Sequence, residues 1–173
     1  MGNVGTVIEI IIAVIDQLKE LIKMSKMYVM IGAPGCGKST YIKNHIKDNE
    51  IVISRDTIRF SMLKDEDEYF SKEKQVYDEF IRQINAAIAN GTDFYVDQTS
   101  LNRGARNKLF SRLEKRPEQV IGIYFNTPLE TILQRNAQRT GRALVPEDAV
   151  INMFNSLTKP TTDEGFTDVW EVE

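Results

Sequence analysis

Cysteine and histidine are almost absent from this chain. Its 173 residues include one cysteine, Cys36, and one histidine. A single cysteine cannot form an internal disulfide, and a zinc site of the usual kind needs several cysteine or histidine ligands. These absences exclude a disulfide-stapled domain and a His- or Cys-rich zinc protein. They fit a reducing compartment, so we expect a cytoplasmic protein.

Excess basic charge and a long hydrophobic run are also missing. The 22 Lys and Arg residues stand against 25 Asp and Glu residues, a net charge of −3. Binding to long duplex nucleic acid relies on clustered basic residues, so the composition argues against it and leaves short or single-stranded nucleic acid open. The apolar residues 7–15 are interrupted by Glu9, and no signal-peptide cleavage pattern follows. We expect no membrane association.

What is present is an alternation of short apolar runs with longer segments of helical period. This alternation is typical of a parallel sheet with crossover helices. The expected strands are 27–31, 51–54, 94–97, 120–125 and 169–172, and the expected helices are 38–47, 70–90, 103–116, 129–139 and 147–157. Gly91, Asn102, Pro117 and Pro146 stand where such helices would end or begin. The sequence therefore predicts a three-layer α/β domain over residues 24–173, with a sheet of about five strands.

The segment Gly32-Ala33-Pro34-Gly35-Cys36-Gly37-Lys38-Ser39 fits the Walker A pattern of P-loop proteins, between an expected strand and an expected helix. Glycines allow the backbone N–H groups to wrap around a phosphate, and the helix that follows adds its positive dipole end. Lys38 would supply a charge between the β- and γ-phosphates, and Ser39 would ligate Mg²⁺. We expect ATP or another nucleoside triphosphate to bind here with Mg²⁺, through Gly32, Gly35, Cys36, Gly37, Lys38, Ser39 and Thr40.

A second polar cluster, Ser54-Arg55-Asp56-Thr57-Ile58-Arg59, follows the second expected strand. On a helix, Asp56 and Arg59 would share a face. A carboxylate accepts the proton of an attacking hydroxyl, and a guanidinium binds a phosphate that marks the acceptor. Spacing alone leaves another interpretation equally open, in which Asp56 only caps the helix and Arg59 is a surface charge. The acidic run 65–68 is interpreted as a solvated loop or helix end.

Further motifs follow in order: Asp97-Gln98-Thr99-Ser100-Leu101-Asn102, Arg135-Asn136-x-x-Arg139 and Val145-Pro146-Glu147. Together with the two segments above, they resemble the kinase domain of polynucleotide 5′-kinases, over about residues 27–157. The resemblance implies that Asp56 is the general base on a 5′-hydroxyl and that Arg59 binds the acceptor's phosphate. It also implies that Lys38 and Arg139 stabilise the transition state, and that Arg135 and Arg139 hold the donor phosphates from one helical face.

The third-strand segment departs from the family pattern. Ser100 stands where Asn is usual, and Asp97 and Gln98 compete for the position of the family's aspartate. The resemblance implies that Asp97 and Thr99 lie on the acceptor side, with Asp97 orienting Arg59. Asp97 could instead hold a Mg²⁺-bound water as a Walker-B-like carboxylate. Both roles stay open at this point.

The resemblance does not cover residues 1–23, which are expected to form an amphipathic helix. Apolar residues at 4, 8, 11, 15, 18 and 22 follow the spacing of a coiled-coil seam. Those at 7, 14 and 21 widen the apolar stripe beyond what a two-stranded coil needs. We expect a homo-oligomer formed through residues 4–22. The alternatives are a helix folded back on its own domain and, because the polar face is acidic, a less favoured membrane-surface helix.

The sequence thus predicts an ATP-dependent phosphotransferase whose acceptor is the 5′-hydroxyl of a polynucleotide or nucleotide. A kinase of a nucleoside, sugar or antibiotic is the alternative, favoured by the lack of a broad basic surface. A nucleotide-binding assembly module is a third alternative, disfavoured because pure binding needs no base such as Asp56.

Overall fold

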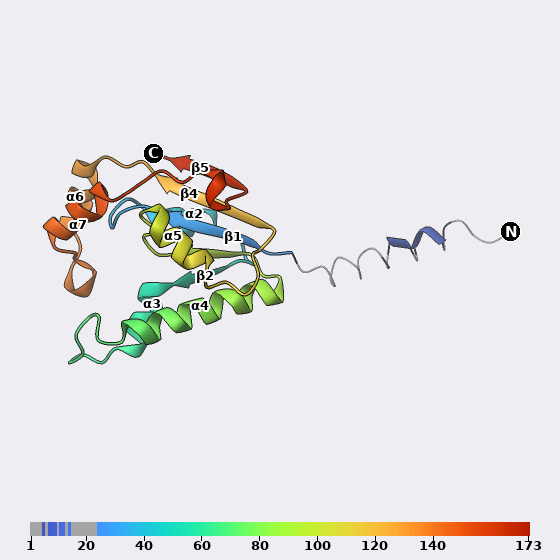
Figure 1. Cartoon of the computed structure of the whole chain (residues 1–173), viewed down its shortest axis with the longest axis horizontal. Coiled ribbons are helices and arrows are strands. Elements are labelled where there is room, and N and C mark those ends of the chain that lie inside the picture. Colours follow the sequence, from blue (N-terminus) through green and yellow to red (C-terminus); the bar gives the residue numbers. More distant parts are fainter. Residues whose placement is uncertain (1–4, 6, 10, 13, 15–23) are drawn as a thin grey trace.

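The computed structural model describes residues 5, 7–9, 11, 12, 14 and 24–173. Within residues 24–173 the chain forms one parallel sheet of five strands in the order β2-β3-β1-β4-β5 (Figure 1). The strands are β1 (Lys26–Ile31), β2 (Ile51–Ser54), β3 (Phe94–Asp97), β4 (Gln119–Phe125) and β5 (Asp168–Val172). The predicted parallel α/β fold is confirmed, and three strands begin one residue earlier than expected.

Helices cover both faces of the sheet and so make the three predicted layers. They are α2 (Lys38–His45), α3 (Arg55–Met62), α4 (Glu73–Asn90), α5 (Arg103–Phe110), α6 (Leu129–Ala137) and α7 (Glu147–Asn155), with short 3₁₀ turns η1 (Gly141–Ala143) and η2 (Thr162–Glu164). Side chains from α3, α4 and α5 join the core cluster on one face, and side chains from α2, α6 and α7 join the cluster on the other. β1 lies at the centre and is buried after its first residue.

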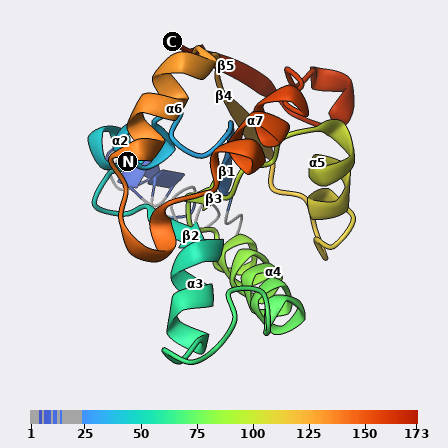
Figure 2. The same ribbon diagram turned by 90° about the vertical axis from the view of Figure 1, so that its left-hand side faces the viewer.

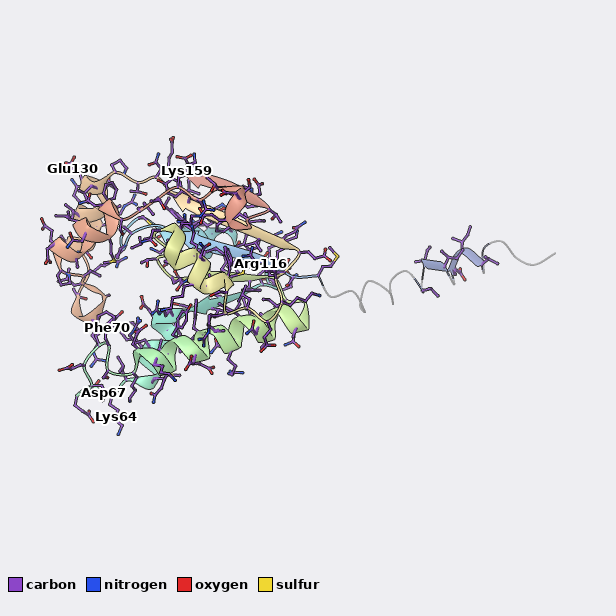
Figure 3. All side chains as sticks on the ribbon, viewed as in Figure 1. Lys64, Asp67, Phe70, Arg116, Glu130 and Lys159 are labelled. Atoms are coloured by element: carbon purple, nitrogen blue, oxygen red, sulfur yellow. The ribbon has the colours of Figure 1, made fainter. Side chains whose placement is uncertain are left out.

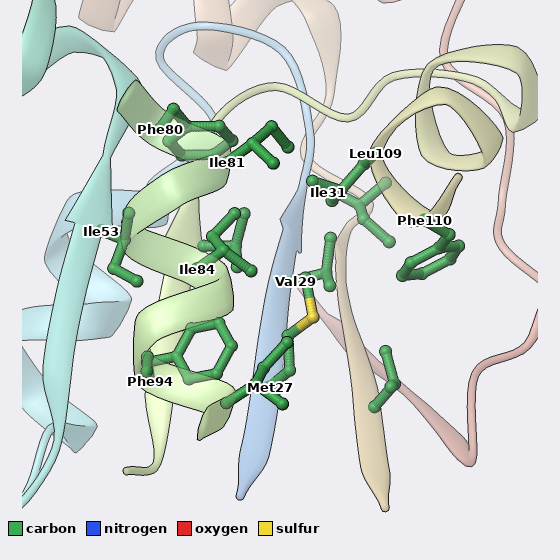
Figure 4. Packing of buried hydrophobic residues seen from close by; sticks show 14 of the residues in the cluster. Met27, Val29, Ile31, Ile53, Phe80, Ile81, Ile84, Phe94, Leu109 and Phe110 are labelled. Carbon is green, nitrogen blue, oxygen red and sulfur yellow. The ribbon is translucent and has the colours of Figure 1, made fainter. Parts of the chain in front are cut away.

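The larger core cluster shows why α4 lies along the sheet. Phe80, Ile81 and Ile84 recur at helical spacing and pack on β-strand residues such as Val29 and Phe94 (Figure 4). Each fully buried side chain of this kind contributes about 1.5–3 kcal/mol relative to exposure. The apolar residues that recur at helical spacing in the sequence therefore form the stripe that packs α4 against the sheet.

Several helices are shorter than the sequence predicts, and α5 differs most. Asn102 caps its start as expected, with its side chain accepting from the Ala105 N–H at 2.9 Å. The helix ends at Phe110, whereas the sequence predicted an end at Arg116 before Pro117. The Asn85 side chain explains part of the difference, because it accepts from the Glu114 N–H at 3.1 Å and so stabilises the turn that follows. Such a partner on another helix leaves no local signal in the sequence.

The carboxyl ends of the strands gather the polar residues at one edge of the sheet, the edge seen in Figure 2. Ser54 at the end of β2 pairs in register with Asp97 at the end of β3. β1, the next strand along, ends at Ile31, just before the glycine-rich segment. The crevice outside these ends is where ligands bind in folds of this kind.

The N-terminal prediction falls largely on residues that the structure does not describe. Positions 4, 15, 18 and 22 of the expected seam, and position 21 beside it, lie outside the described residues. The described residues between 5 and 14 are helical, and the apolar ones among them, Val7, Ile8, Ile11, Ile12 and Val14, are exposed. In the part of the chain that the structure describes, no helix is both long and apolar enough to cross a membrane.

Candidate active site

The glycine-rich segment between β1 and α2 forms a tight loop that leaves the start of α2 uncapped. A Cβ on Gly32 would come within 2.5 Å of the Cys36 Sγ and 3.1 Å of the Phe125 Cβ, so no side chain fits there. Gly37, the N-cap of α2, has a φ of 110° and makes no side-chain cap hydrogen bond. The first N–H groups of α2 are thus left for an anion, as the Walker A pattern predicts.

Lys38 and two residues distant in sequence hold the loop in shape. The Lys38 Nζ donates to the carbonyl oxygens of Gly32 at 2.9 Å and Ala33 at 3.0 Å. The Gly32 N–H donates to the Thr99 carbonyl at 3.0 Å, and the Thr127 hydroxyl donates to the Cys36 carbonyl at 3.0 Å. Thr99, assigned to the acceptor side by the resemblance, therefore supports the phosphate loop. Thr127 was missed, although its place just after β4 at the carboxyl edge could have indicated it.

Cys36 shapes the loop through its backbone. Its thiol is buried and lies 3.8 Å from the Lys38 Nζ, and its N–H donates to the Ala33 carbonyl at 3.3 Å. Ser39 and Thr40, by contrast, are exposed on the first turn of α2. The hydroxyl groups are therefore accessible and the thiol is not.

The structure brings together Asp56 and Arg59, the two residues expected to serve the acceptor. The cap of α3 is Ser54, whose hydroxyl accepts from the Thr57 N–H at 3.4 Å, so the interpretation of Asp56 as an N-cap is wrong. Asp56 lies in the first turn with its side chain 65% exposed, and its Oδ1 accepts from the Arg59 Nη1. The Tyr69 hydroxyl donates to the same Oδ1 at 3.0 Å. Within the described residues, Oδ2 has no hydrogen-bond partner.

Arg59 is only 4% exposed, which excludes a free surface charge. Its Nη2 donates to Glu73 Oε2 at 2.8 Å and its Nη1 to the Tyr69 hydroxyl at 3.0 Å. Burial by itself would lower the pKa of Arg59, but Glu73, Tyr69 and Asp56 outweigh it and raise the pKa. Glu73 also accepts from Arg55, so one carboxylate at the start of α4 holds two guanidinium groups. Glu73 and Tyr69 were not predicted, because no motif contains them.

Asp97 ends β3, which lies between β1 and β2 in the sheet, and in the described part of the chain it makes no hydrogen bond or ion pair with Arg59. Burial raises the pKa of Asp97, the charge of Lys38 opposes this, and the charge of Asp56 adds to it. A hydrogen bond with Ser54 also favours the charged form. The carboxylates that pair with Arg59 are those of Glu73 and Asp56, where the resemblance implied Asp97.

Arg135 and Arg139 are separated by the end of α6. The helix ends at Ala137, so Arg139 lies beyond it, and the prediction of one shared helical face is wrong. Arg135 reaches the phosphate loop, where its Nη1 lies 3.5 Å from the Cys36 carbonyl. Arg139 donates to the Ala143 carbonyl at 3.4 Å inside the lid segment, residues 138–146. The structure therefore places Arg135, but not Arg139, at the loop.

The lid segment touches the acceptor side through Arg142. Its Nη2 donates to the carbonyl oxygens of Lys64 at 3.1 Å, Asp65 at 2.8 Å and Asp67 at 3.4 Å. These carbonyls belong to the turn of residues 63–72 between α3 and α4, which contains the acidic run. The run was expected to be only a solvated loop or helix end, whereas its backbone binds the lid.

A buried arginine supports the segment after β3. Arg106 is fully buried, and its Nε and Nη2 donate to the Glu164 carboxylate at 2.7 and 2.8 Å. Its Nη1 donates to the carbonyls of Ser100 at 3.2 Å and Thr158 at 3.0 Å. Ser100, next to Thr99, has a φ of 44°, a backbone conformation that is rare for residues other than glycine. We call these contacts the Arg106 clamp, and they fix the segment that supports the phosphate loop.

The chain is similar to a curated protein over most of its length. L-seryl-tRNA(Sec) kinase of Methanococcus maripaludis is 28% identical over 147 residues, which are 79% of this chain and 54% of that protein. The chain thus spans about half the length of this curated relative.

Two solved structures show the same fold. A chain of the Pnkp1/Rnl/Hen1 RNA repair complex superposes with a TM-score of 0.66 at 24% identity, over 78% of this chain and 44% of that one. Kti12 of Chaetomium thermophilum in complex with ADP-AlF3 gives a TM-score of 0.60 at 13% identity, over 84% and 88% of the two chains. At these identities the likeness concerns the fold alone, which is that of P-loop NTPases and kinases.

The family itself is shown by a match of a different kind. The model of the family described as AAA domain matches residues 27–160, which run from β1 through the lid segment and α7. That range includes the phosphate loop, Asp56, Arg59, Arg135 and Arg139. Because the match covers most of the chain, this protein belongs to the AAA domain family.

Proposed function

We propose that this domain transfers the γ-phosphoryl group of ATP, or of another nucleoside triphosphate, to the 5′-hydroxyl of a polynucleotide or nucleotide. The observation that carries the proposal is the state of the Asp56 carboxylate. Arg59 and Tyr69 fix its Oδ1, while Oδ2 has no partner within the described residues. An oriented carboxylate with one open oxygen, close to a phosphate cradle, suits a base that receives the proton of an attacking hydroxyl.

The residues divide between the two substrates. The N–H groups of residues 35–39 and the Lys38 ammonium bind the donor phosphates, assisted by Arg135 and, when the lid moves inward, Arg139. Asp56 Oδ2 accepts the acceptor's proton as the acceptor oxygen bonds to the γ-phosphorus. The bond between that phosphorus and the β–γ bridging oxygen breaks, and the nucleoside diphosphate is the leaving group. Arg59 anchors a phosphate of the acceptor.

The donor set also fits Mg²⁺. The exposed Ser39 hydroxyl and the Asp97 carboxylate are oxygen ligands, which this ion prefers, and the donor phosphates would complete its shell. Bound Mg²⁺ would neutralise charge on those phosphates. Because Glu73 already orients Arg59, Asp97 is left for the Mg²⁺ role, which we assign to it.

Two further observations bear on the acceptor. The curated relative is by name a kinase of L-seryl-tRNA(Sec), and one similar structure belongs to an RNA repair complex, which supports a nucleic-acid acceptor. The second candidate is a small-molecule kinase, favoured by the net charge of −3. A sugar kinase from Janibacter sp. HTCC2649 shares the fold at a TM-score of 0.57 and 19% identity. The open oxygen of Asp56 argues against a module that only binds nucleotide.

A phosphate-transfer screen tests the proposal. The full chain is incubated with γ-labelled ATP, Mg²⁺ and one acceptor at a time: 5′-hydroxyl DNA, 5′-hydroxyl RNA, 3′-mononucleotides, nucleosides, seryl-tRNA and gluconate. We expect label on the 5′-hydroxyl acceptors, loss of transfer in Asp56→Asn, and near wild-type transfer in Glu66→Gln, a matched change in the exposed acidic run. Label on gluconate or nucleosides alone would favour the small-molecule kinase, and Asp56→Asn with wild-type kcat would refute the base assignment.

A further inference from the structure

Three aromatic side chains gather beside the acceptor residues. Phe60 comes from α3, and Tyr69 and Phe70 come from the turn before α4. The ring centroids of Tyr69 and Phe70 are 4.7 Å apart and those of Phe60 and Tyr69 are 6.0 Å apart, both pairs edge to face. Phe70 is 68% exposed and Phe60 is 42% exposed. We call these three residues the aromatic patch.

Tyr69 connects the aromatic patch to the proposed chemistry. Its hydroxyl donates to Asp56 and accepts from Arg59, each at 3.0 Å. Burial raises the pKa of Tyr69, and the charge of Asp56 adds to this effect, so the hydroxyl keeps its proton at neutral pH. The Arg59 guanidinium carbon lies 4.6 Å from the centroid of the Tyr69 ring and 5.6 Å from that of the Phe70 ring. The exposed ring of Phe70 therefore stands next to the proposed phosphate anchor.

Phe70 belongs to the turn of residues 63–72, which the lid segment contacts. In the view of Figure 3, Phe70 is labelled above Asp67 and Lys64 of the same turn, on the side toward the lid segment. The lid and this turn are joined by the hydrogen bonds from Arg142 to the carbonyls of Lys64 and Asp65. A ring in this position would meet whatever part of the acceptor lies next to its anchored phosphate.

We propose that Phe70, backed by Tyr69 and Phe60, is a stacking surface for a nucleobase of the acceptor. The inference rests on the proposed function and narrows it, because a stacked base requires a nucleotide or an unpaired 5′ end, whereas a sugar presents no such face. Aromatic side chains can stack on any base, because every base has a π-face, and such stacking is typical of proteins that bind single-stranded nucleic acid. Recognition by stacking also suits a chain of net charge −3, since it needs no extended basic surface.

The test compares two acceptors that differ only in the base: a deoxynucleoside 3′-monophosphate and its abasic 1,2-dideoxyribose 3-phosphate analogue. For the wild type we expect KM for the base-bearing acceptor to be lower by roughly 5- to 150-fold, the effect of removing one stacked base. Phe70→Leu should abolish this difference and leave KM for the abasic acceptor unchanged, and Phe70→Trp should retain it. Trp170→Leu is the matched control, because Trp170 is 42% exposed on β5 at the far edge of the sheet.

The alternative role for Phe70 is to shield Arg59. In that case Phe70→Leu would raise KM for both acceptors equally, which would overturn the proposal, as would no effect on either acceptor.

A second measurement does not depend on turnover. In Phe70→Trp, a base stacked on the new indole should quench its fluorescence when a single-stranded 5′-hydroxyl trinucleotide is titrated in, with the wild type giving the Trp170 background. If no acceptor is phosphorylated but the quenching occurs, the proposed function fails and the stacking surface stands. If the trinucleotide binds without quenching, or does not bind, the stacking surface is refuted.

Discussion

The Glu164→Gln substitution tests the Arg106 clamp directly. Arg106 is fully buried, and the Glu164 side chain is 2% exposed. Glutamine keeps the shape of the side chain but removes its charge, so the guanidinium would remain buried without a counter-charge. Breaking a buried ion pair from one side costs about 3–5 kcal/mol, and we expect the free energy of unfolding to fall by that amount.

Urea denaturation followed by circular dichroism measures this loss. With a slope of about 2 kcal/mol per molar urea, the midpoint should fall by roughly 2 M. Asp163→Asn is the control, because its ion pair with Arg103 is exposed on both sides and is worth less than about 1 kcal/mol. A loss below about 1 kcal/mol for Glu164→Gln would refute the reasoning.

The double variant Arg106→Met with Glu164→Leu separates the ion pair from the rest of the clamp. Replacing a buried pair by apolar residues is often neutral. Here it would also leave the carbonyls of Ser100 and Thr158 without their donor, at about 1–3 kcal/mol each, so we expect no recovery. Wild-type stability in the double variant would show that these carbonyls do not need Arg106.

Three other predictions concern the site and the N-terminus. Lys38→Ala should lower kcat/KM by roughly 10²-fold or more, because the ammonium that would stabilise the transferred phosphoryl group is lost. An unchanged urea midpoint would show that the loss does not come from unfolding after removal of the bonds to the loop carbonyls. Arg59→Ala should raise KM for a 3′-phosphorylated acceptor far more than for a nucleoside, and equal increases would contradict the anchor role. Deleting residues 1–23 should convert an oligomer into an active monomer by light scattering, and a monomer before and after deletion would rule out the oligomer.

Sequence reasoning succeeded where the chemistry is local. The phosphate loop depends on a short segment whose glycines, lysine and serine have fixed spacing, so the pattern predicted its position between β1 and α2. The contact of Asp56 with Arg59 followed in the same way from a separation of three residues on a helix. The five strands were found because each is an apolar run bounded by polar residues.

The partners of these residues could not be predicted. Glu73 and Tyr69 lie 14 and 10 residues from Arg59 and meet it only because the turn after α3 folds back. Arg106 and Glu164 are separated by 58 residues, and nothing in the sequence marks either as buried. Helix ends were overestimated for a related reason, since helical period does not reveal a partner on another helix, such as Asn85, which binds the turn after α5.

The contact between Arg142 and the turn before α4 has a consequence for how the sequence could vary over evolution. Arg142 binds backbone carbonyls, which every residue type supplies, so substitutions at Asp65, Glu66 and Glu68 would preserve the contact. Asp67 is different, because its carboxylate accepts from the Lys64 N–H at 2.9 Å and the Lys72 ammonium at 2.8 Å and so sets the path of the turn. An insertion or deletion would shift the carbonyls out of reach of Arg142. Homologous chains that keep this contact should therefore differ freely at positions 65, 66 and 68, but should keep the aspartate at position 67 and the length of the turn.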